Sequence, residues 1–173
     1  MKTLKAFTID FGPIEQSMRD WCRDADDHYL NIMTGKVVVI SKSLIRAMAM
    51  ETEVDQDVLP EWEARLIPLA RKIVVEGSTD YLRIPEAFGH PEREWMSKFA
   101  EEVHLDELKK KLIHALKGRG ACKRFKEILK SYPEDEKRWS RFRSSCWKVK
   151  IQSWLESIGI LAIETAPGRT AVH

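Results

Sequence analysis

The sequence lacks any long hydrophobic run. Its 173 residues contain no apolar stretch close to the ~20 residues that a membrane-spanning helix needs. The segment KVVVI at residues 36–40 has only the length of a β-strand. The N-terminal segment contains lysines, but Asp10 and Pro13 interrupt it before the apolar core of a signal peptide could form. We therefore expect a cytoplasmic protein that does not enter a membrane.

Cysteine and histidine are too scattered to indicate a disulfide framework or a metal site. The three cysteines, Cys22, Cys122 and Cys146, form no CxxC pair, and the five histidines form no HExxH motif. Structural zinc needs convergent cysteine and histidine ligands, so we predict no metal and no cofactor. Cys122 is expected to be a small buried side chain, since free cysteines are often buried. A reactive thiol near a helix N-terminus is the alternative.

Charge is distributed unevenly along a chain that can form a core. Hydrophobic residues make up 43% of it and include six tryptophans, which argues against disorder. The length suits one domain, which we place at residues 1–162, followed by a flexible tail at 163–173. Residues 1–103 contain 13 Lys/Arg and 19 Asp/Glu, whereas residues 104–150 contain 15 and 6, for net charges of −6 and +9. We expect an acidic part at about 1–103 and a basic helical part at about 104–160 that suits an anionic partner.

Three short segments have the composition of β-strands. Residues 28–33 and 36–41 flank a Thr34–Gly35 turn, where glycine supplies the positive φ that a tight hairpin needs. Because a hairpin alone is marginally stable, we expect residues 80–84 to add a third strand, ended by Pro85. The predicted fold class is α+β, with a small three-stranded antiparallel sheet packed with a mostly helical C-terminal half.

Helical spacing predicts most of the remaining chain. A short first helix is expected after Asp10, with Ile14, Met18 and Trp21 on one face. Residues 42–77 are expected to form a helix, an acidic loop and a second helix, which Pro68 should kink or interrupt. From residue 91 to Gly159 the whole chain is expected to be helical, in four helices.

The C-terminal helices carry apolar stripes that predict a core. Phe125, Leu129, Trp139 and Phe142 are expected to be buried, together with Cys122. The last predicted helix carries two apolar stripes along its length. One consists of Trp139, Phe142, Cys146 and Val149, and the other of Trp147, Ile151, Trp154, Leu155 and Ile158. A helix with so wide an apolar arc is expected to lie between neighbours. The alternative is that these aromatics, interleaved with arginines, stack on bases.

The corner between two of these helices carries the functional prediction. Two glycines surround an arginine there, and glycine readily adopts the left-handed conformation that ends a helix. The free N–H groups at the start of the next helix attract anions. The predicted anion-binding residues are Gly118, Arg119, Gly120, Lys123, Arg124 and Lys126. A helix corner without a ligand is the simpler interpretation, and it does not exclude anion contact.

Several motifs, in their order along the chain, resemble the bacterial uncharacterised protein family 0158. They are YLNIMTGKVVVI at 29–40, IPEAFGHPEREWMSKFAEEV at 84–103, ALKGRGACKRFKEIL at 115–129, the pair Trp139 and Phe142, and WLESIGI at 154–160. The resemblance covers about residues 27–160. Its most specific part is Gly118–Ala121 with Arg124, Phe125 and Lys126. Family members usually have phenylalanine at the position of Cys122 and arginine at that of Lys123, which supports burial of position 122. The resemblance implies no activity.

We expect a non-enzymatic binding domain whose basic helical surface contacts RNA or another polyanion. An acidic protein surface is the alternative partner, as in a protein–protein interaction or small regulatory module, and complementary charged halves would also suit a homodimer. An enzyme is the less favoured alternative, and no catalytic residue is predicted. The one dense polar group is Asp24, Asp26, Asp27 and His28. It is expected to be a solvated turn, because adjacent residues of a strand point to opposite faces.

Overall fold

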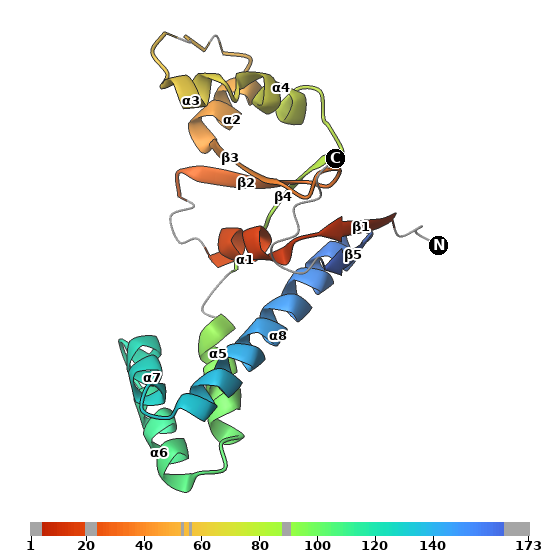
Figure 1. Cartoon of the computed structure of the whole chain (residues 1–173). Coiled ribbons are helices and arrows are strands. Elements are labelled where there is room, and N and C mark those ends of the chain that lie inside the picture. Colours follow the sequence, from red (N-terminus) through yellow and green to blue (C-terminus); the bar gives the residue numbers. More distant parts are fainter. Residues whose placement is uncertain (1–4, 20–23, 53, 56, 88–90, 165–173) are drawn as a thin grey trace. The chain divides into compact units, whose positions relative to one another are not determined.

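The chain divides into two compact units in a computed structural model, which describes residues 5–19, 24–52, 54–55, 57–87 and 91–164 (Figure 1). The first unit comprises residues 1–86 and 154–173, and the second comprises residues 87–153. The single domain at 1–162 stays a prediction. The predicted tail at 163–173 begins inside a strand that reaches Glu164, and its remaining residues lie outside the described part.

The first unit contains the predicted antiparallel sheet. Its strands are β2 (Asp26–Asn31), β3 (Val37–Ser41) and β4 (Tyr81–Arg83), in the order β3-β2-β4. The hairpin turn has Gly35 at a φ of 69°, and the Gly35 N–H donates to the carbonyl of Asn31 at 2.8 Å. The three strands and the α+β class are therefore confirmed.

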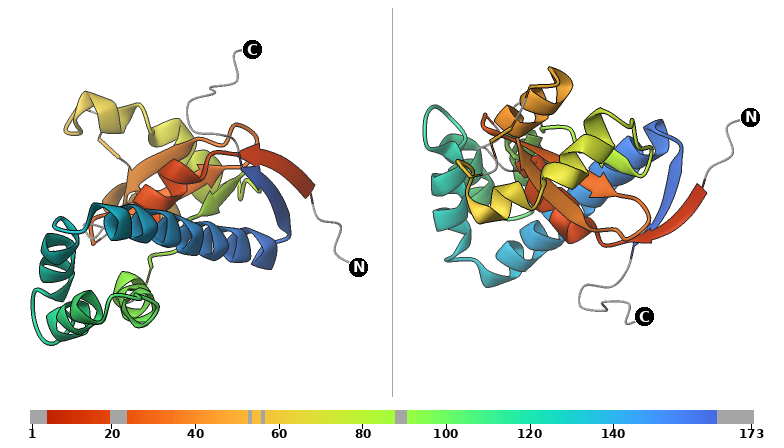
Figure 2. Two further views of the ribbon diagram at one scale, coloured as in Figure 1. Left: turned by 60° about the horizontal axis from the view of Figure 1, so that its bottom comes forward. Right: turned by 90° about the horizontal axis from the view of Figure 1, so that it is seen from above.

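A second, two-stranded sheet was not predicted. Strand β1 (Lys5–Ile9) pairs in parallel with β5 (Ile160–Glu164), so segments near the two ends of the described chain lie side by side (Figure 2). No strand was predicted for residues 160–164. Parallel pairing between distant segments needs no local turn, so it leaves no hairpin signal in the sequence.

Short helices cover both faces of the three-stranded sheet. They are α1 (Phe11–Arg19), α2 (Lys42–Ala49), α3 (Glu61–Ala64) and α4 (Ile67–Val74). Helices α2 and α4 lie over one face and α1 lies over the other (Figure 1). The carboxylate of Asp10 accepts from the Gly12 N–H at 2.9 Å, as expected of a residue at a helix start, whereas Trp21 lies outside the described residues. Pro68 stands in the first turn of α4, where proline is tolerated, so the predicted interruption is confirmed.

Four helices belong to the second unit. They are α5 (Pro91–Glu101), α6 (Asp106–Ala115), α7 (Ala121–Leu129) and α8 (Pro133–Ser157), of which residues up to Ser153 fall in this unit. Phe125, Leu129 and Trp139 are buried in its core, as predicted. Cys122 and Phe142 are only partly buried against that core. The prediction for Val149 was wrong, because 66% of its surface is exposed.

Polar contacts tie α5 to α8 within the second unit. The carboxylate of Glu92 accepts from Arg143 Nε at 2.9 Å and from Trp147 Nε1 at 3.2 Å. The Trp147 ring also meets Trp95 edge to face, with ring centroids 5.1 Å apart. A half-buried carboxylate needs such donors, and they fix how the start of α5 lies against α8.

Candidate functional site

The corner between α6 and α7 requires both of its glycines for backbone reasons. Gly118 and Gly120 have φ values of 74° and 72°, in the left-handed region that side chains other than glycine rarely adopt. A Cβ atom on Gly118 would meet nothing within 4 Å, so conformation rather than space requires the glycine. Gly120 is the N-cap of α7 and provides no side-chain cap. The N–H groups of the first turn therefore receive no help from the cap residue.

Arg124 holds this corner together. Its guanidinium donates to the carbonyl of Ala115 at 3.0 Å and also to the carbonyls of Lys117 and Arg119. The last carbonyls of a helix have no intrahelical partner, and basic side chains can satisfy them. Arg124, one of the predicted anion-binding residues, thus serves as a cap for the end of α6. Its guanidinium is engaged within the corner.

The other charged members of the predicted set face solvent. Arg119, Lys123 and Lys126 are exposed, and their side chains make no hydrogen bond or ion pair within the described residues. On α7 and its C-cap residue, Lys123, Lys126 and Lys130 recur at spacings of three and four residues, so they share one stripe. That stripe runs beside the face of Phe125 and Leu129, which are buried in the core.

Positive charge extends beyond the corner. Between Leu108 and Tyr132 the chain has nine Lys/Arg residues and one acidic residue, Glu127. Glu127 forms an ion pair with Lys130 at 2.8 Å, and this hydrogen bond lowers the pKa of the Glu127 carboxyl. Lys111 pairs with Glu107 at 2.5 Å on α6. Between Leu108 and Tyr132, the exposed Lys and Arg side chains with neither an ion pair nor a hydrogen bond in the described residues are Lys110, Lys117, Arg119, Lys123 and Lys126. We call these five the basic surface.

The polar group at the start of β2 is partly buried. Asp27 and His28 are buried, so the expectation of a solvated turn was wrong for both. Asp27 accepts from Arg83 Nε at 3.0 Å and from a second guanidinium nitrogen at 2.6 Å. This hydrogen bond raises the pKa of Arg83. His28 follows directly along the strand and therefore points to the opposite face of the sheet.

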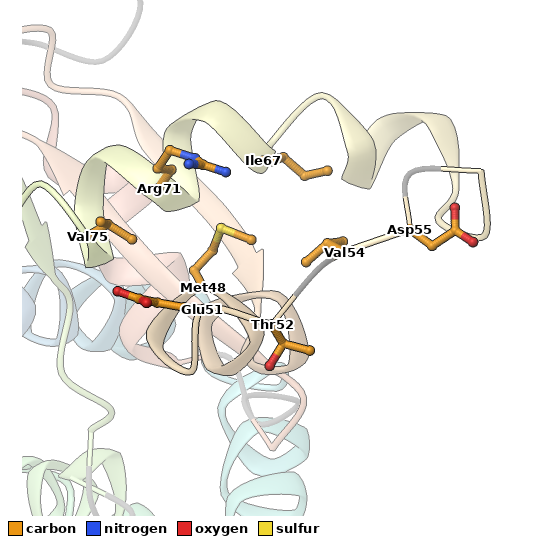
Figure 3. A pocket seen from close by; sticks show the side chains of 8 residues that line it. All are labelled: Met48, Glu51, Thr52, Val54, Asp55, Ile67, Arg71 and Val75. Carbon is orange, nitrogen blue, oxygen red and sulfur yellow. The ribbon is translucent and has the colours of Figure 1, made fainter.

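A cleft in the first unit was not predicted from the sequence. It has a volume of about 820 Å³ and lies between α4 and the C-terminal end of α2 (Figure 3). Its lining residues are Met48, Glu51, Thr52, Val54, Asp55, Ile67, Arg71 and Val75. The acidic composition of residues 50–60 indicated only a loop, because the arginine that faces it is 20 residues further along the chain at Arg71.

In the part of the chain that the structure describes, no three His, Cys, Asp or Glu side chains come together as metal ligands. Over the same residues, no helix has the length and apolar character needed to cross a bilayer.

Comparisons with known proteins identify a family. The sequence profile of "Uncharacterised protein family (UPF0158)" matches residues 14–165. A UPF0158 protein of Pseudomonas aeruginosa is 30% identical over 130 residues, which cover 75% of this chain and 71% of that protein. No solved structure matches the chain. The matched span covers most of both units, and the chain therefore belongs to the uncharacterised protein family UPF0158.

Proposed function

We propose that the chain is a non-enzymatic cytoplasmic protein that binds RNA or a similar polyanion through the basic surface of its second unit. One observation carries the proposal. The basic surface has five exposed bases without an ion pair in the described residues, all within 17 residues of one helical hairpin. Exposed cations gathered in this way attract polyanions and release the counterions that those polyanions carry.

The corner supports the same proposal in a second way. Arg124 holds the backbone between Ala115 and Arg119, so the bases nearby are mounted on a fixed turn rather than on a loose loop. The N-terminus of α7, with its partial positive charge, lies at the same turn. Phosphate contacts of this kind position a nucleic acid without reading its sequence. We therefore expect little sequence preference.

The salt dependence of RNA binding tests the proposal. A fluorescent single-stranded RNA of mixed sequence is titrated with the protein at 50 and 200 mM salt, with duplex DNA and heparin in parallel. Each phosphate contact with a single strand contributes about −0.7 to the slope of log affinity against log salt, so five contacts give a slope of roughly −3.5. The affinity should then fall about 100-fold between the two salt concentrations.

Two double variants separate the basic surface from overall charge. Lys123→Ala with Lys126→Ala removes two contacts and should make the slope shallower by about 1.4. Lys98→Ala with Lys137→Ala removes the same charge from α5 and α8, where both lysines are exposed and paired with Glu94 and Glu134. The control should leave the slope unchanged. Absence of salt-dependent binding to all three polyanions would contradict the proposal and would favour an acidic protein surface as the partner.

A further inference from the structure

We infer that the cleft between α2 and α4 binds a small zwitterion with an apolar side chain, either a free amino acid or the equivalent groups of a short peptide. The cleft lies entirely in the first unit and shares no residue with the basic surface. Its volume of about 820 Å³ falls within the range of small-molecule pockets.

The floor of the cleft is apolar. Met48 on α2 and Ile67 on α4 are 6% and 8% exposed, and both also belong to the hydrophobic core beneath the cleft. Val75, which is 54% exposed, stands at one end of the same wall. A ligand with an aliphatic side chain would remove this apolar surface from water, which is the main source of affinity in such pockets.

Two opposite charges, on Arg71 and Glu51, stand on the two sides of this floor, and the second carboxylate of the lining, Asp55, lies at the other end of the cleft (Figure 3). Arg71 belongs to α4, and Glu51 follows the C-terminal end of α2 (Figure 3). The two side chains do not pair with each other, and neither forms an ion pair elsewhere in the described residues. An arginine fork binds a carboxylate through two parallel hydrogen bonds, and a carboxylate accepts from an ammonium group. A ligand that supplies both charges and an apolar side chain complements all three features.

The backbone at Glu51 supports a role for its side chain. Glu51 has a φ of 52°, a left-handed conformation that no other non-glycine residue shows among those described. The position ends α2, with the Glu51 N–H bonded to the carbonyl of Met48 at 3.2 Å and the Thr52 N–H to that of Ala47 at 3.0 Å. Glycine is the usual residue at such a position. Strained backbone conformations cluster at ligand-binding sites, so the strain at Glu51 supports a role for its carboxylate in binding a ligand in the cleft.

Titration of the full chain tests the inference directly. The protein is labelled with ¹³C in its methionine methyl groups, and the Met48 signal is followed as L-leucine or leucyl-leucine is added. A ligand of so few atoms should bind in the micromolar to millimolar range. N-acetyl-leucine lacks the ammonium group and leucinamide lacks the carboxylate, and each should bind ~10-fold more weakly, as expected for loss of one charge-assisted hydrogen-bonding group.

Variants assign each ligand charge to one residue. Glu51→Gln should weaken leucine binding and abolish the preference for leucine over N-acetyl-leucine, whereas Arg71→Gln should abolish the preference over leucinamide. Glu51→Gly removes the same carboxylate and relieves the backbone strain, so it should weaken leucine binding as Glu51→Gln does, without loss of folding. Glu76→Gln and Arg46→Gln alter exposed charges that do not line the cleft and serve as matched controls.

The outcomes separate the two ligand sources and can also overturn the inference. Tighter binding of leucyl-leucine than of leucine identifies a short peptide as the ligand, and the reverse order identifies a free amino acid. Either order supports a zwitterion site. The inference is overturned if the Met48 signal shows no saturable shift with either ligand. It is also overturned if the blocked ligands bind as well as leucine, or if the Glu51→Gln and Arg71→Gln variants bind like the controls.

Discussion

Replacement of Phe125 by alanine tests the core of the second unit. The Phe125 ring is fully buried, and it meets Trp139 and Phe99 edge to face with centroid distances of 5.2 and 6.3 Å. Emptying a large aromatic site costs ~3–5 kcal/mol. Each aromatic pair adds about 0.5–1.5 kcal/mol beyond its buried area, so we expect the upper half of that range. The loss should be concentrated in the second unit, because a helix as short as α7 depends on tertiary packing.

Hydrogen exchange measures this effect unit by unit. A chain with two compact units need not unfold in one step, so a single denaturation midpoint could mix two transitions. Peptides from α6 and α7 should exchange faster in the Phe125→Ala variant, while peptides from β2 and β3 should keep their protection. Phe142→Ala is the control, because Phe142 is only partly buried and should cost less. A change within about 0.5 kcal/mol for Phe125→Ala would refute the packing account, since that range is typical of surface positions.

Three further predictions follow from other features of the two units. Arg124→Ala should lower stability by ~1–2 kcal/mol, since three carbonyls lose a charged donor, whereas Lys123→Ala should change stability by less than about 0.5 kcal/mol in urea denaturation. Equal effects would show that Arg124 does not cap α6. Burial raises the pKa of the Cys146 thiol, so its alkylation at neutral pH should be slower in the native protein than in urea and should accelerate as pH rises. Equal rates in the two states, measured by mass spectrometry, would contradict this. Glu51→Gly should stabilise the protein by ~0.5–1 kcal/mol, the relief of left-handed strain less the added entropy of unfolded glycine. A lower melting temperature would contradict the strain at Glu51.

Local patterns were sufficient to predict much of the fold. The Thr34–Gly35 turn predicts the hairpin because the turn and both strands are contiguous, and the 3–4 spacing around Phe125 predicts the buried face of α7. The pairing of β1 with β5 joins segments more than 150 residues apart, and no local feature specifies it. The burial of Asp27 was missed for a similar reason, because its partner Arg83 comes from a different strand.

In the candidate sites too, the sequence predicts what neighbouring residues specify and misses contacts between distant segments. The glycines and lysines of the α6–α7 corner are close together in the sequence, so the predicted helices already place them near one another. The helical spacing did not predict the role of Arg124, because its side chain turns back to donate to carbonyls five to nine residues earlier. Arg71 and Glu51 lie on separate elements, and only the packing of α4 against α2 brings them to one cleft. Neither residue type nor spacing indicates that cleft.

Removal of Glu127, the one acidic side chain between Leu108 and Tyr132, tests the proposed function most directly. Glu127 holds Lys130 in an ion pair, so Glu127→Gln should free one more lysine for a phosphate. RNA affinity at low salt should rise about 2–3-fold, and the salt slope should steepen by about 0.7. Glu94→Gln is the matched control, since it frees Lys98 on α5 and changes the net charge by the same amount. Tighter binding and a steeper slope for Glu127→Gln alone is the predicted result. An unchanged slope, or the same gain in both variants, would contradict a polyanion surface on α6 and α7.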